Sequence, residues 1–302
     1  MYDIVIIGGG PAGLTAALYA ARAGKSVMIL EANAFGGQIA TAPRVENFPS
    51  VQEIAGAELA NLMFEQATSH GVEFDMGNAT VEKSANGFTV TTEYGSYDCY
   101  SVVIATGVSH KKLGVANEDK QGVCYCAVCD GAFYKDKSVC VVGDGNSAAQ
   151  YALYLADTCS EVQLLTMFDK LFCDKELVDR IVANSKITWT KNVTVTELMG
   201  EDKVEGVVYR DSDGAITYAD TSAVFVAIGQ EPHNEQFSSL VKLDGKGYVI
   251  AGEDCKTSCE GIFVAGDCRT KSMRQCATAV SDGAIAGFSA AMYVDALRQR
   301  SK

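Results

Sequence analysis

The sequence predicts an α/β protein built from two Rossmann-like, three-layer nucleotide-binding domains. Two observations carry this prediction. A strand, a glycine-rich turn and a helix follow one another directly at two places in the 302 residues, and several further apolar segments end in glycine. A composition that is 48% hydrophobic and 21% charged is that of a well-packed globular chain.

The first strand-turn-helix unit occupies residues 3–33, "DIVIIGGGPAGLTAALYAARAGKSVMILEAN". An apolar strand leads into Gly8-x-Gly10-x-x-Gly13, an alanine-rich helix follows, and a second strand ends at Glu31. Glycines at this spacing permit a tight turn, a close approach of the backbone to a pyrophosphate and close helix-strand packing. A carboxylate at the end of the second strand can accept hydrogen bonds from a ribose. The unit therefore predicts a bound dinucleotide cofactor.

The second strand-turn-helix segment occupies residues 138–166, "SVCVVGDGNSAAQYALYLADTCSEVQLLT", and carries Gly143-x-Gly145-x-x-Ala148. Its strand, turn, helix and second strand follow in the same order as those of the segment at residues 3–33. Other short apolar strands run into glycine, as strands that end at ligand-facing turns do: "GFTVTT", "SVVIATG", "SAVFVAIGQEP" and "GIFVAGD". The last of these precedes a long C-terminal helix.

A dithiol motif, "CAVCDG" at residues 126–131, lies between the two glycine units. Cys126 and Cys129 have the spacing of a pair that closes into a small disulfide ring, and Asp130 follows as a proton donor or acceptor. Half of a zinc site is the alternative, but zinc needs a second pair of ligands. Cys255 and Cys259 form the nearest candidate pair, and no histidine is close to either pair in the sequence. A redox pair without a metal is the better interpretation.

These motifs, in this order, resemble those of the low-molecular-weight thioredoxin reductases over essentially the whole chain. The shared segments are the first glycine turn, "GGQ" at 36–38, "ENFP" at 46–49, "ATG" at 105–107, "CAVCDG", "AIGQEP" at 227–232, and "GIFVAGD" with "RQ" at 274–275. The resemblance implies an FAD-binding domain formed by residues 1–114 and 240–302, and an inserted dithiol domain at 115–239. It also implies a homodimer, and a domain rotation that presents the dithiol alternately to the flavin and to thioredoxin.

The resemblance further implies a role for individual residues. Eight of them would contact FAD at the pyrophosphate (Gly8, Gly10 and Gly13), the adenosine ribose (Glu31), the flavin region (Gln38 and Asn47), the ribityl chain or phosphates (Asp267) and the isoalloxazine edge (Gln275). Cys129 would be the sulfur nearest the flavin, and Cys126 the one that attacks the thioredoxin disulfide. Asp130 would be the acid-base group.

The second strand-turn-helix segment, at residues 138–166, departs from the relatives that use pyridine nucleotides. Those relatives carry a His-Arg-Arg run and a third arginine after the second strand, where this chain has Thr166, Met167, Phe168 and Phe172. Methionine and phenylalanine cannot replace guanidinium groups on the 2′-phosphate of NADPH. Asp144 replaces a usual glycine and places a carboxylate beside the expected pyrophosphate.

NADH has no 2′-phosphate, but its ribose is usually held by an acidic residue at the strand end. Thr166 occupies that position in this chain, and Asp169 lies three residues further on. The pattern resembles that of the ferredoxin-dependent flavin thioredoxin reductases, which lack the nucleotide clamp. It implies that electrons pass from reduced ferredoxin through FAD and the dithiol to thioredoxin. An NAD(P)H-dependent thioredoxin reductase with an atypical nucleotide site and an FAD-dependent dithiol oxidase using oxygen stay open as alternatives.

Charge and cysteine content restrict the partners and the compartment. A net charge of −13 argues against nucleic acid and anionic membranes as partners. An acidic ferredoxin would therefore need a local basic patch, for which "HKK" at 110–112 and "RTKSMR" at 269–274 are candidates, although either could be an ordinary solvated cluster. The sequence shows no signal peptide and no apolar run of about 18 residues, and its 11 cysteines do not form a secreted disulfide framework. A cytoplasmic location is expected.

Overall fold

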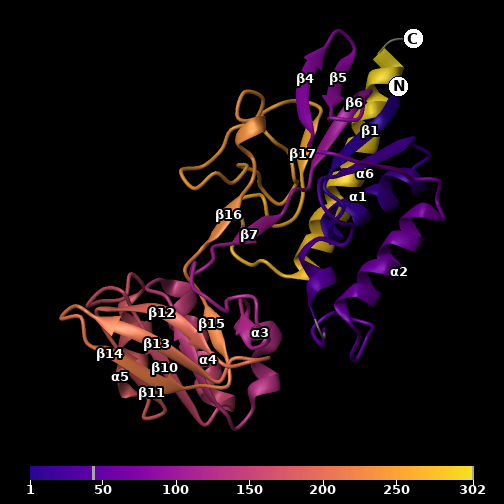
Figure 1. Cartoon of the computed structure of the whole chain (residues 1–302). Helices are drawn as coiled ribbons and strands as arrows, with labels where there is room; N and C mark the ends of the chain where they lie inside the picture. The colour runs from indigo at the N-terminus through magenta and orange to yellow at the C-terminus, as the bar shows by residue number, and fades with distance from the viewer. Residues whose placement is uncertain (43–44, 301–302) are drawn as a thin grey trace. The chain divides into compact units, whose positions relative to one another are not determined.

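The computed structural model describes residues 1–42 and 45–300 and divides into two compact units (Figure 1). The first unit combines Met1–Ser109 with Glu231–Lys302, and the second, His110–Gln230, is inserted between these two parts of the chain. Both crossings lie earlier than the boundaries expected after residues 114 and 239. The chain crosses at β7 (Val108–His110) and β16 (Gln230–Pro232), which pair in a two-stranded sheet that the motif spacing does not mark.

The first unit contains a seven-stranded sheet of order β3-β2-β1-β6-β5-β4, with β17 paired to β6. Strands β3, β2, β1, β6 and β17 run parallel to their neighbours, and β4 and β5 extend the sheet antiparallel. The strands are β1 (Tyr2–Ile7), β2 (Val27–Glu31), β3 (Glu73–Met76), β4 (Thr80–Ser84), β5 (Gly87–Thr91), β6 (Ser96–Ile104) and β17 (Ile262–Val264).

Helices α1 (Pro11–Arg22), α2 (Gly56–Thr68) and α6 (Cys276–Arg300) belong to the same unit, as do the short η1 (Gly37–Thr41) and η3 (Glu235–Phe237). Two glycines on α6 let it lie directly against α1, and the two helices run side by side in Figure 1. A Cβ atom would lie 2.3 Å from the Ala12 carbonyl oxygen at Gly283 and 2.2 Å from that of Ala16 at Gly287. Close packing of α1 fixes the direction in which its N-terminal turn faces.

The second unit has three layers around a parallel sheet of order β11-β10-β9-β15-β8. Its strands are β8 (Val123–Cys124), β9 (Ser138–Val142), β10 (Glu161–Leu165), β11 (Ile187–Thr190) and β15 (Val224–Val226). Helices α4 (Asn146–Thr158) and α5 (Lys175–Ala183) cover one face of the sheet. The antiparallel strands β12 (Val193–Met199), β13 (Gly206–Asp211) and β14 (Ile216–Asp220) cover the other.

The side chains of β9 show how this layering arises. Val139 and Val141 pack with the helices, whereas Cys140 and Val142 pack with the antiparallel strands. A strand that alternates between two buried faces reads as a continuous apolar run, which is what the sequence shows. Two short helices, α3 (Ala127–Asp130) and η2 (Gly131–Tyr134), follow β8 and hold the dithiol. In the described part of the chain, no helix is long and apolar enough to cross a membrane.

Candidate flavin and dithiol sites

The first glycine turn connects β1 to α1, and its shape requires glycine at two positions. Gly8 has φ +110°, and a Cβ atom there would lie 2.3 Å from the Ala105 carbonyl oxygen. A Cβ atom at Gly13 would lie 1.9 Å from the carbonyl oxygen of Gly8. At Gly10 the nearest atom would be the Cα of Gly37 at 3.8 Å. The turn is thus closed toward the protein at Gly8 and Gly13 and open to a ligand at Gly10.

Glu31, the last residue of β2, is buried and fixed against the turn. Its Oε2 accepts a hydrogen bond from the Gly9 amide at 2.7 Å, and its Oε1 accepts one from the Asn33 amide at 2.9 Å. A carboxylate oxygen can accept more than one hydrogen bond, so Glu31 can also accept from a ribose hydroxyl. The position and chemistry of Glu31 fit the adenosine end of FAD.

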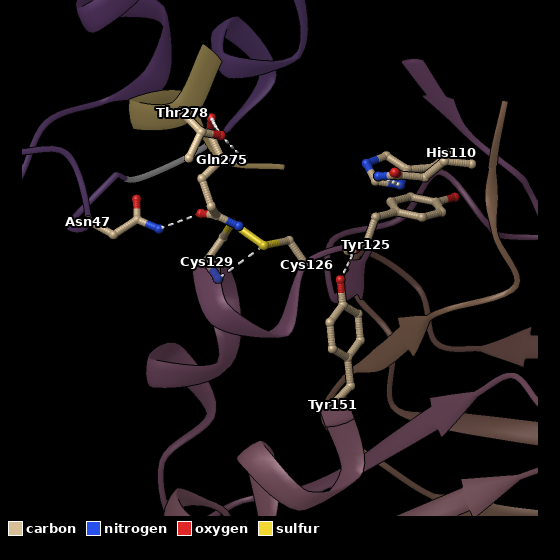
Figure 2. The surroundings of a disulfide bond; sticks show 9 residues. Asn47, His110, Tyr125, Cys126, Cys129, Tyr151, Gln275 and Thr278 are labelled. Atoms are coloured by element: carbon tan, nitrogen blue, oxygen red, sulfur yellow. Dashed lines mark hydrogen bonds between the residues drawn. A yellow bond between two sulfur atoms is a disulfide. The ribbon is translucent and has the colours of Figure 1, made fainter. Parts of the chain in front are cut away.

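Two exposed side chains predicted near the flavin belong to loops of the first unit. Gln38 lies in η1 and donates a hydrogen bond from Nε2 to the Val108 carbonyl. The Asn47 Nδ2 donates to Oε1 of Gln275 at 3.1 Å, as Figure 2 shows. Gln275 directly precedes α6. The structure therefore brings Asn47 and Gln275 together.

Asp267 carries the clearest sign of a ligand contact in the first unit. It follows β17, and its Oδ1 is the one buried side-chain oxygen or nitrogen without a hydrogen-bond partner among the described residues. Burial raises its pKa to about 6, against the opposing effect of Lys271 and Arg274. Buried polar atoms in native proteins almost always have partners. A hydroxyl-rich chain such as the ribityl of FAD fits this acceptor.

A buried charge cluster supports the turn that carries Asp267. Asp282 on α6 accepts hydrogen bonds from the Gly266 amide at 3.0 Å, from Arg269 at 2.7 and 2.8 Å and from Lys271 at 2.8 Å. The Arg269 and Lys271 side chains are 2% and 6% exposed. The structure does not support the candidate basic patch at residues 269–274, because two of its three cations, Arg269 and Lys271, face inward. Sequence reasoning missed Asp282, whose one visible signal is a carboxylate within a helix of small residues.

The dithiol lies at the start of α3. Cys126 and Cys129 form a disulfide with a Cα–Cα distance of 5.3 Å, and the Cys129 amide donates to the Cys126 sulfur at 3.2 Å (Figure 2). The Asp130 amide donates to the Cys126 carbonyl at 3.0 Å. Burial raises the pKa of the Asp130 carboxyl to about 6. An amide aimed at the Cys126 sulfur would stabilise a thiolate there after reduction.

The other nine cysteines are free thiols, and seven of them are buried. Burial raises the pKa of Cys124 and of Cys255 to about 12, which keeps both protonated and unreactive near neutral pH. No cluster of three or more metal-ligating side chains occurs within residues 1–42 and 45–300. The Cys126–Cys129 pair is thus the only disulfide in the described structure.

Comparisons with known proteins place these features in a family. The family described as pyridine nucleotide-disulphide oxidoreductase matches residues 2–283. The thioredoxin reductase of Bacillus subtilis (strain 168) is 40% identical over 100% of this chain and 98% of its own. That of Listeria monocytogenes serovar 1/2a is 38% identical over 99% of this chain and 96% of its own. The crystal structure of thioredoxin reductase from Streptococcus pyogenes MGAS5005 has a TM-score of 0.93 at 41% identity, covering 98% of this chain and 99% of that one.

The chain belongs to the low-molecular-weight thioredoxin reductases. This membership confirms the α/β fold class and the cofactor FAD, and it makes the chain a flavoprotein disulfide oxidoreductase. The roles of individual residues and the identity of the electron donor stay predictions.

The second glycine turn is bound by a neighbouring segment of the same domain. Gly143 has φ +149°, and a Cβ atom there would lie 2.4 Å from the Ala227 carbonyl oxygen, so the turn has no room for a side chain at this position, as at Gly8. However, Asp144 in this turn binds the segment after β10. Its Oδ1 accepts from the Phe168 amide at 3.1 Å, and its carbonyl accepts from the Phe172 amide at 2.6 Å. The chain's own amides therefore bind this turn.

The end of β10 and the segment after it present one buried hydroxyl and three exposed apolar side chains. Thr166 is fully buried, donates to the Phe168 carbonyl at 2.8 Å and accepts from the Trp189 indole at 3.0 Å. Met167, Phe168 and Phe172 are 57%, 48% and 55% exposed. The strand end thus offers an inward-facing hydroxyl and exposed apolar side chains.

Proposed function

We propose that this thioredoxin reductase receives electrons from reduced ferredoxin rather than from NADPH or NADH. FAD, held by the first unit, would supply the electrons that reduce the Cys126–Cys129 disulfide, and this dithiol would then reduce the disulfide of thioredoxin. The observation that carries the proposal is the segment after β10, which holds the second glycine turn through Asp144 and carries Met167, Phe168 and Phe172 in place of arginines.

The size of the effect follows from hydrogen-bond energies. Each charge-assisted contact to a phosphate stabilises a complex by roughly 1.5–3 kcal/mol. Loss of three such contacts weakens binding by about three to six orders of magnitude. The Asp144 carboxylate adds like-charge repulsion to any pyrophosphate at the turn. NADH avoids the first penalty but still meets Asp144, and at the strand end it meets Thr166, whose hydroxyl donates to the Phe168 carbonyl.

In the first unit, the backbone of Gly8, Gly10 and Gly13 would hold the pyrophosphate of FAD, and Glu31 its adenosine ribose. The unpartnered Oδ1 of Asp267 would accept from the ribityl chain or lie near the phosphates. The flavin end would lie near Gln38, Asn47 and Gln275. FAD, when bound, can accept single electrons from a one-electron donor and pass on a pair.

The dithiol then performs two exchange steps. The Cys126 thiolate attacks one sulfur of the thioredoxin disulfide, which forms a mixed disulfide and releases one thioredoxin thiolate. Cys129 attacks the Cys126 sulfur next, which restores the Cys126–Cys129 disulfide and releases the second thiolate. The Cys129 amide at 3.2 Å from the Cys126 sulfur favours Cys126 as the attacking thiolate.

Asp130 handles the proton of the attacking thiol. With a pKa of about 6, its carboxyl is mostly ionised at pH 7 and still close enough to neutrality to return a proton. It would take the proton from the Cys126 thiol and pass it to a departing thioredoxin thiolate. No external acid or base is then needed for the exchange.

The family likeness also supports a homodimer that works in the cytoplasm, which sedimentation and cell fractionation would check. For docking ferredoxin, residues 110–112 stay a candidate basic segment, although Lys112 is paired with Asp119 at 2.9 Å.

A coupled assay with the Cys126→Ser protein tests the proposed path. We expect ferredoxin-driven thioredoxin reduction to fall at least 1,000-fold, because a hydroxyl does not replace a thiolate in disulfide exchange. Bleaching of the flavin by reduced ferredoxin should persist. Undiminished thioredoxin turnover would contradict the exchange role of Cys126, and rapid peroxide formation from a small dithiol in the unsubstituted protein would favour the dithiol oxidase instead.

A further inference from the structure

Tyr125, the residue before Cys126, is held at three points by other segments of the second unit. Its hydroxyl donates to Oε1 of Glu118 at 3.0 Å, and its ring stacks on His110 with a centroid distance of 4.9 Å and an interplanar angle of 23°. Its main-chain carbonyl accepts a hydrogen bond from the Tyr151 hydroxyl at 3.2 Å. Figure 2 shows Tyr151 reaching this carbonyl from α4, next to the Cys126–Cys129 disulfide.

The groups that hold Tyr125 are themselves fixed. Glu118 is 7% exposed and also accepts from the amides of Leu113 at 2.5 Å and Gly114 at 2.8 Å. The His110 Nδ1 lies 3.4 Å from Nε2 of Gln230. The main chain at Tyr125 is therefore tied to both ends of the second unit, and through Tyr151 to a helix packed on the central sheet.

Both tyrosine hydroxyls remain donors over the working range of pH. Burial raises the pKa of Tyr125, and the carboxylate of Glu118 raises it further. Burial, and then the charge of Asp130, raise the pKa of Tyr151. Neither phenol ionises near neutral pH, so ionisation does not break either hydrogen bond.

A fixed main chain beside Cys126 changes the balance between disulfide and dithiol. Reduction breaks the S–S bond and adds two electrons and two protons, after which the two sulfurs can separate. If the main chain cannot move, the thiols stay close together and ring closure loses less conformational entropy. The anchoring therefore favours the disulfide and makes the dithiol a stronger reductant. The hydrogen bond from the Cys129 amide to the Cys126 sulfur acts inside the small ring and does not depend on Tyr151.

We propose that Tyr125 and Tyr151 are positioning residues that lower the midpoint potential of the Cys126–Cys129 pair by anchoring the main chain beside Cys126. The proposal rests on the proposed function only in taking this pair as the redox carrier. It does not depend on whether ferredoxin or a nicotinamide supplies the electrons.

The test is an anaerobic redox titration of the FAD-loaded protein in glutathione buffers. Two glutathione molecules reduce the protein disulfide and leave as one glutathione disulfide, and alkylation followed by peptide mass spectrometry counts the Cys126 and Cys129 thiols. We expect Tyr151→Phe, which removes one hydroxyl, to raise the equilibrium constant for reduction about tenfold. That change corresponds to a midpoint potential about 30 mV less negative.

Tyr154→Phe is the matched control. Tyr154 lies one turn along the same helix, α4, is 41% exposed and does not contact Tyr125 through its hydroxyl. Its variant should stay within twofold of the unsubstituted protein. Tyr125→Phe removes the bond to Glu118, keeps the ring that stacks on His110, and should shift the constant in the same direction as Tyr151→Phe.

Values within twofold of the unsubstituted protein for Tyr151→Phe and for Tyr125→Phe would overturn the positioning role. Flavin content and melting temperature identify a variant that has not folded, in which case the other variant decides. If the pair in the unsubstituted protein does not exchange with glutathione at all, its assignment as the redox carrier is wrong and the positioning role falls with it.

Discussion

The first and second glycine turns both leave no room for a side chain at their first glycine, but they differ in the carboxylate that hydrogen-bonds at each turn. In each, a Cβ atom at the first glycine would lie within 2.4 Å of a carbonyl oxygen, that of Ala105 for Gly8 and that of Ala227 for Gly143. At the first turn, the carboxylate comes from the next strand, and Glu31 accepts from the amide of Gly9 in the turn. At the second turn, the carboxylate belongs to the turn itself, and Asp144 accepts from an amide beyond the next strand.

This reversal shows that the glycine spacing specifies the shape of the turn but not its ligand. A carboxylate at the end of the second strand can face a ribose, whereas one inside the turn would repel a pyrophosphate bound there. At the second turn, amides of the segment after β10 donate to the side chain and the carbonyl of Asp144. If the two turns differ in this way, substitutions in the first turn and in the second should have unequal effects.

Alanine scanning of the two turns should give the largest contrast. In Gly13→Ala the new Cβ would lie 1.9 Å from the Gly8 carbonyl oxygen, so the first turn must move. We expect bound FAD and all activity to be lost, at least 1,000-fold. In Gly145→Ala nothing lies within 4 Å of the new Cβ, and the backbone has an ordinary φ of −103°.

Gly145→Ala should therefore keep full ferredoxin-driven activity. FAD content is measured by absorbance and folding by circular dichroism. A loss of activity in Gly145→Ala with FAD still bound would contradict the contrast, because it would mean that the second turn also takes part in turnover.

Substitution of Asp130, the proposed proton carrier of the dithiol, should give the next largest effect. The rate of exchange with thioredoxin should rise with pH through about 6 as Asp130 ionises and becomes able to accept the Cys126 proton. In Asp130→Asn this inflection should vanish and the rate at pH 7 should fall about 100-fold. Stopped-flow measurement with the pre-reduced protein isolates this step. An unchanged inflection near pH 6 in the variant would assign it to another group.

Substitution of Asp267, whose Oδ1 has no hydrogen-bond partner in the described part of the chain, should weaken FAD binding but stabilise the FAD-free protein. Asp267→Asn should weaken FAD binding about 10-fold to 100-fold through the loss of one charged acceptor. It should also stabilise the FAD-free protein by about 1–3 kcal/mol at pH 8, because it removes a buried charge whose Oδ1 has no partner in the described part of the chain.

The pH dependence of this stabilisation has a definite sign. Burial raises the pKa of Asp267 to about 6 in the folded protein, from 3.8 as its ordinary value. The carboxyl therefore favours folding most below pH 4, and this contribution is lost as the pH rises through 6. The advantage of the asparagine variant in urea unfolding should be near zero at pH 4 and greatest above pH 7. A constant advantage at all pH values would contradict the burial of a titrating carboxylate as its cause.

Much of this structure is predictable from the sequence because local spacing determines it. The turns at Gly8 and Gly143 and the dithiol at Cys126 depend on residues adjacent in sequence, and the structure has both turns and the disulfide. Contacts between distant residues are not predictable in this way. Nothing in "RTKSMR" shows that Arg269 lies buried against Asp282. Because of this pairing, Arg269 is not at the surface, where the candidate basic patch would need it.

The domain boundaries and the anchoring of Tyr125 were missed for the same reason. β7 and β16 are far apart in the sequence and become strands by pairing with each other. Tyr125 lies beside the dithiol in the sequence, but its partners Glu118, His110 and Tyr151 come from three separate places.

Rebuilding the clamp should give the smallest change, and in the direction of gain. The combined substitutions Asp144→Gly, Met167→Arg, Phe168→Arg and Phe172→Arg remove the carboxylate from the turn and restore three cations. We expect NADPH to reduce the flavin about tenfold faster than in the unsubstituted protein, because the three arginines add charge-assisted contacts to the 2′-phosphate. A control with glutamine in place of the three arginines separates charge from loss of the apolar side chains.

The rate of flavin reduction by each candidate electron donor can be measured directly. The yellow protein is mixed anaerobically with NADPH, with NADH and with enzymatically reduced ferredoxin, and the flavin absorbance is followed. The difference between the two turns predicts rapid bleaching by ferredoxin alone, followed by reduction of added thioredoxin. Rapid bleaching by either nicotinamide would contradict it, because the second turn would then bind a nucleotide despite Asp144 and the missing arginines.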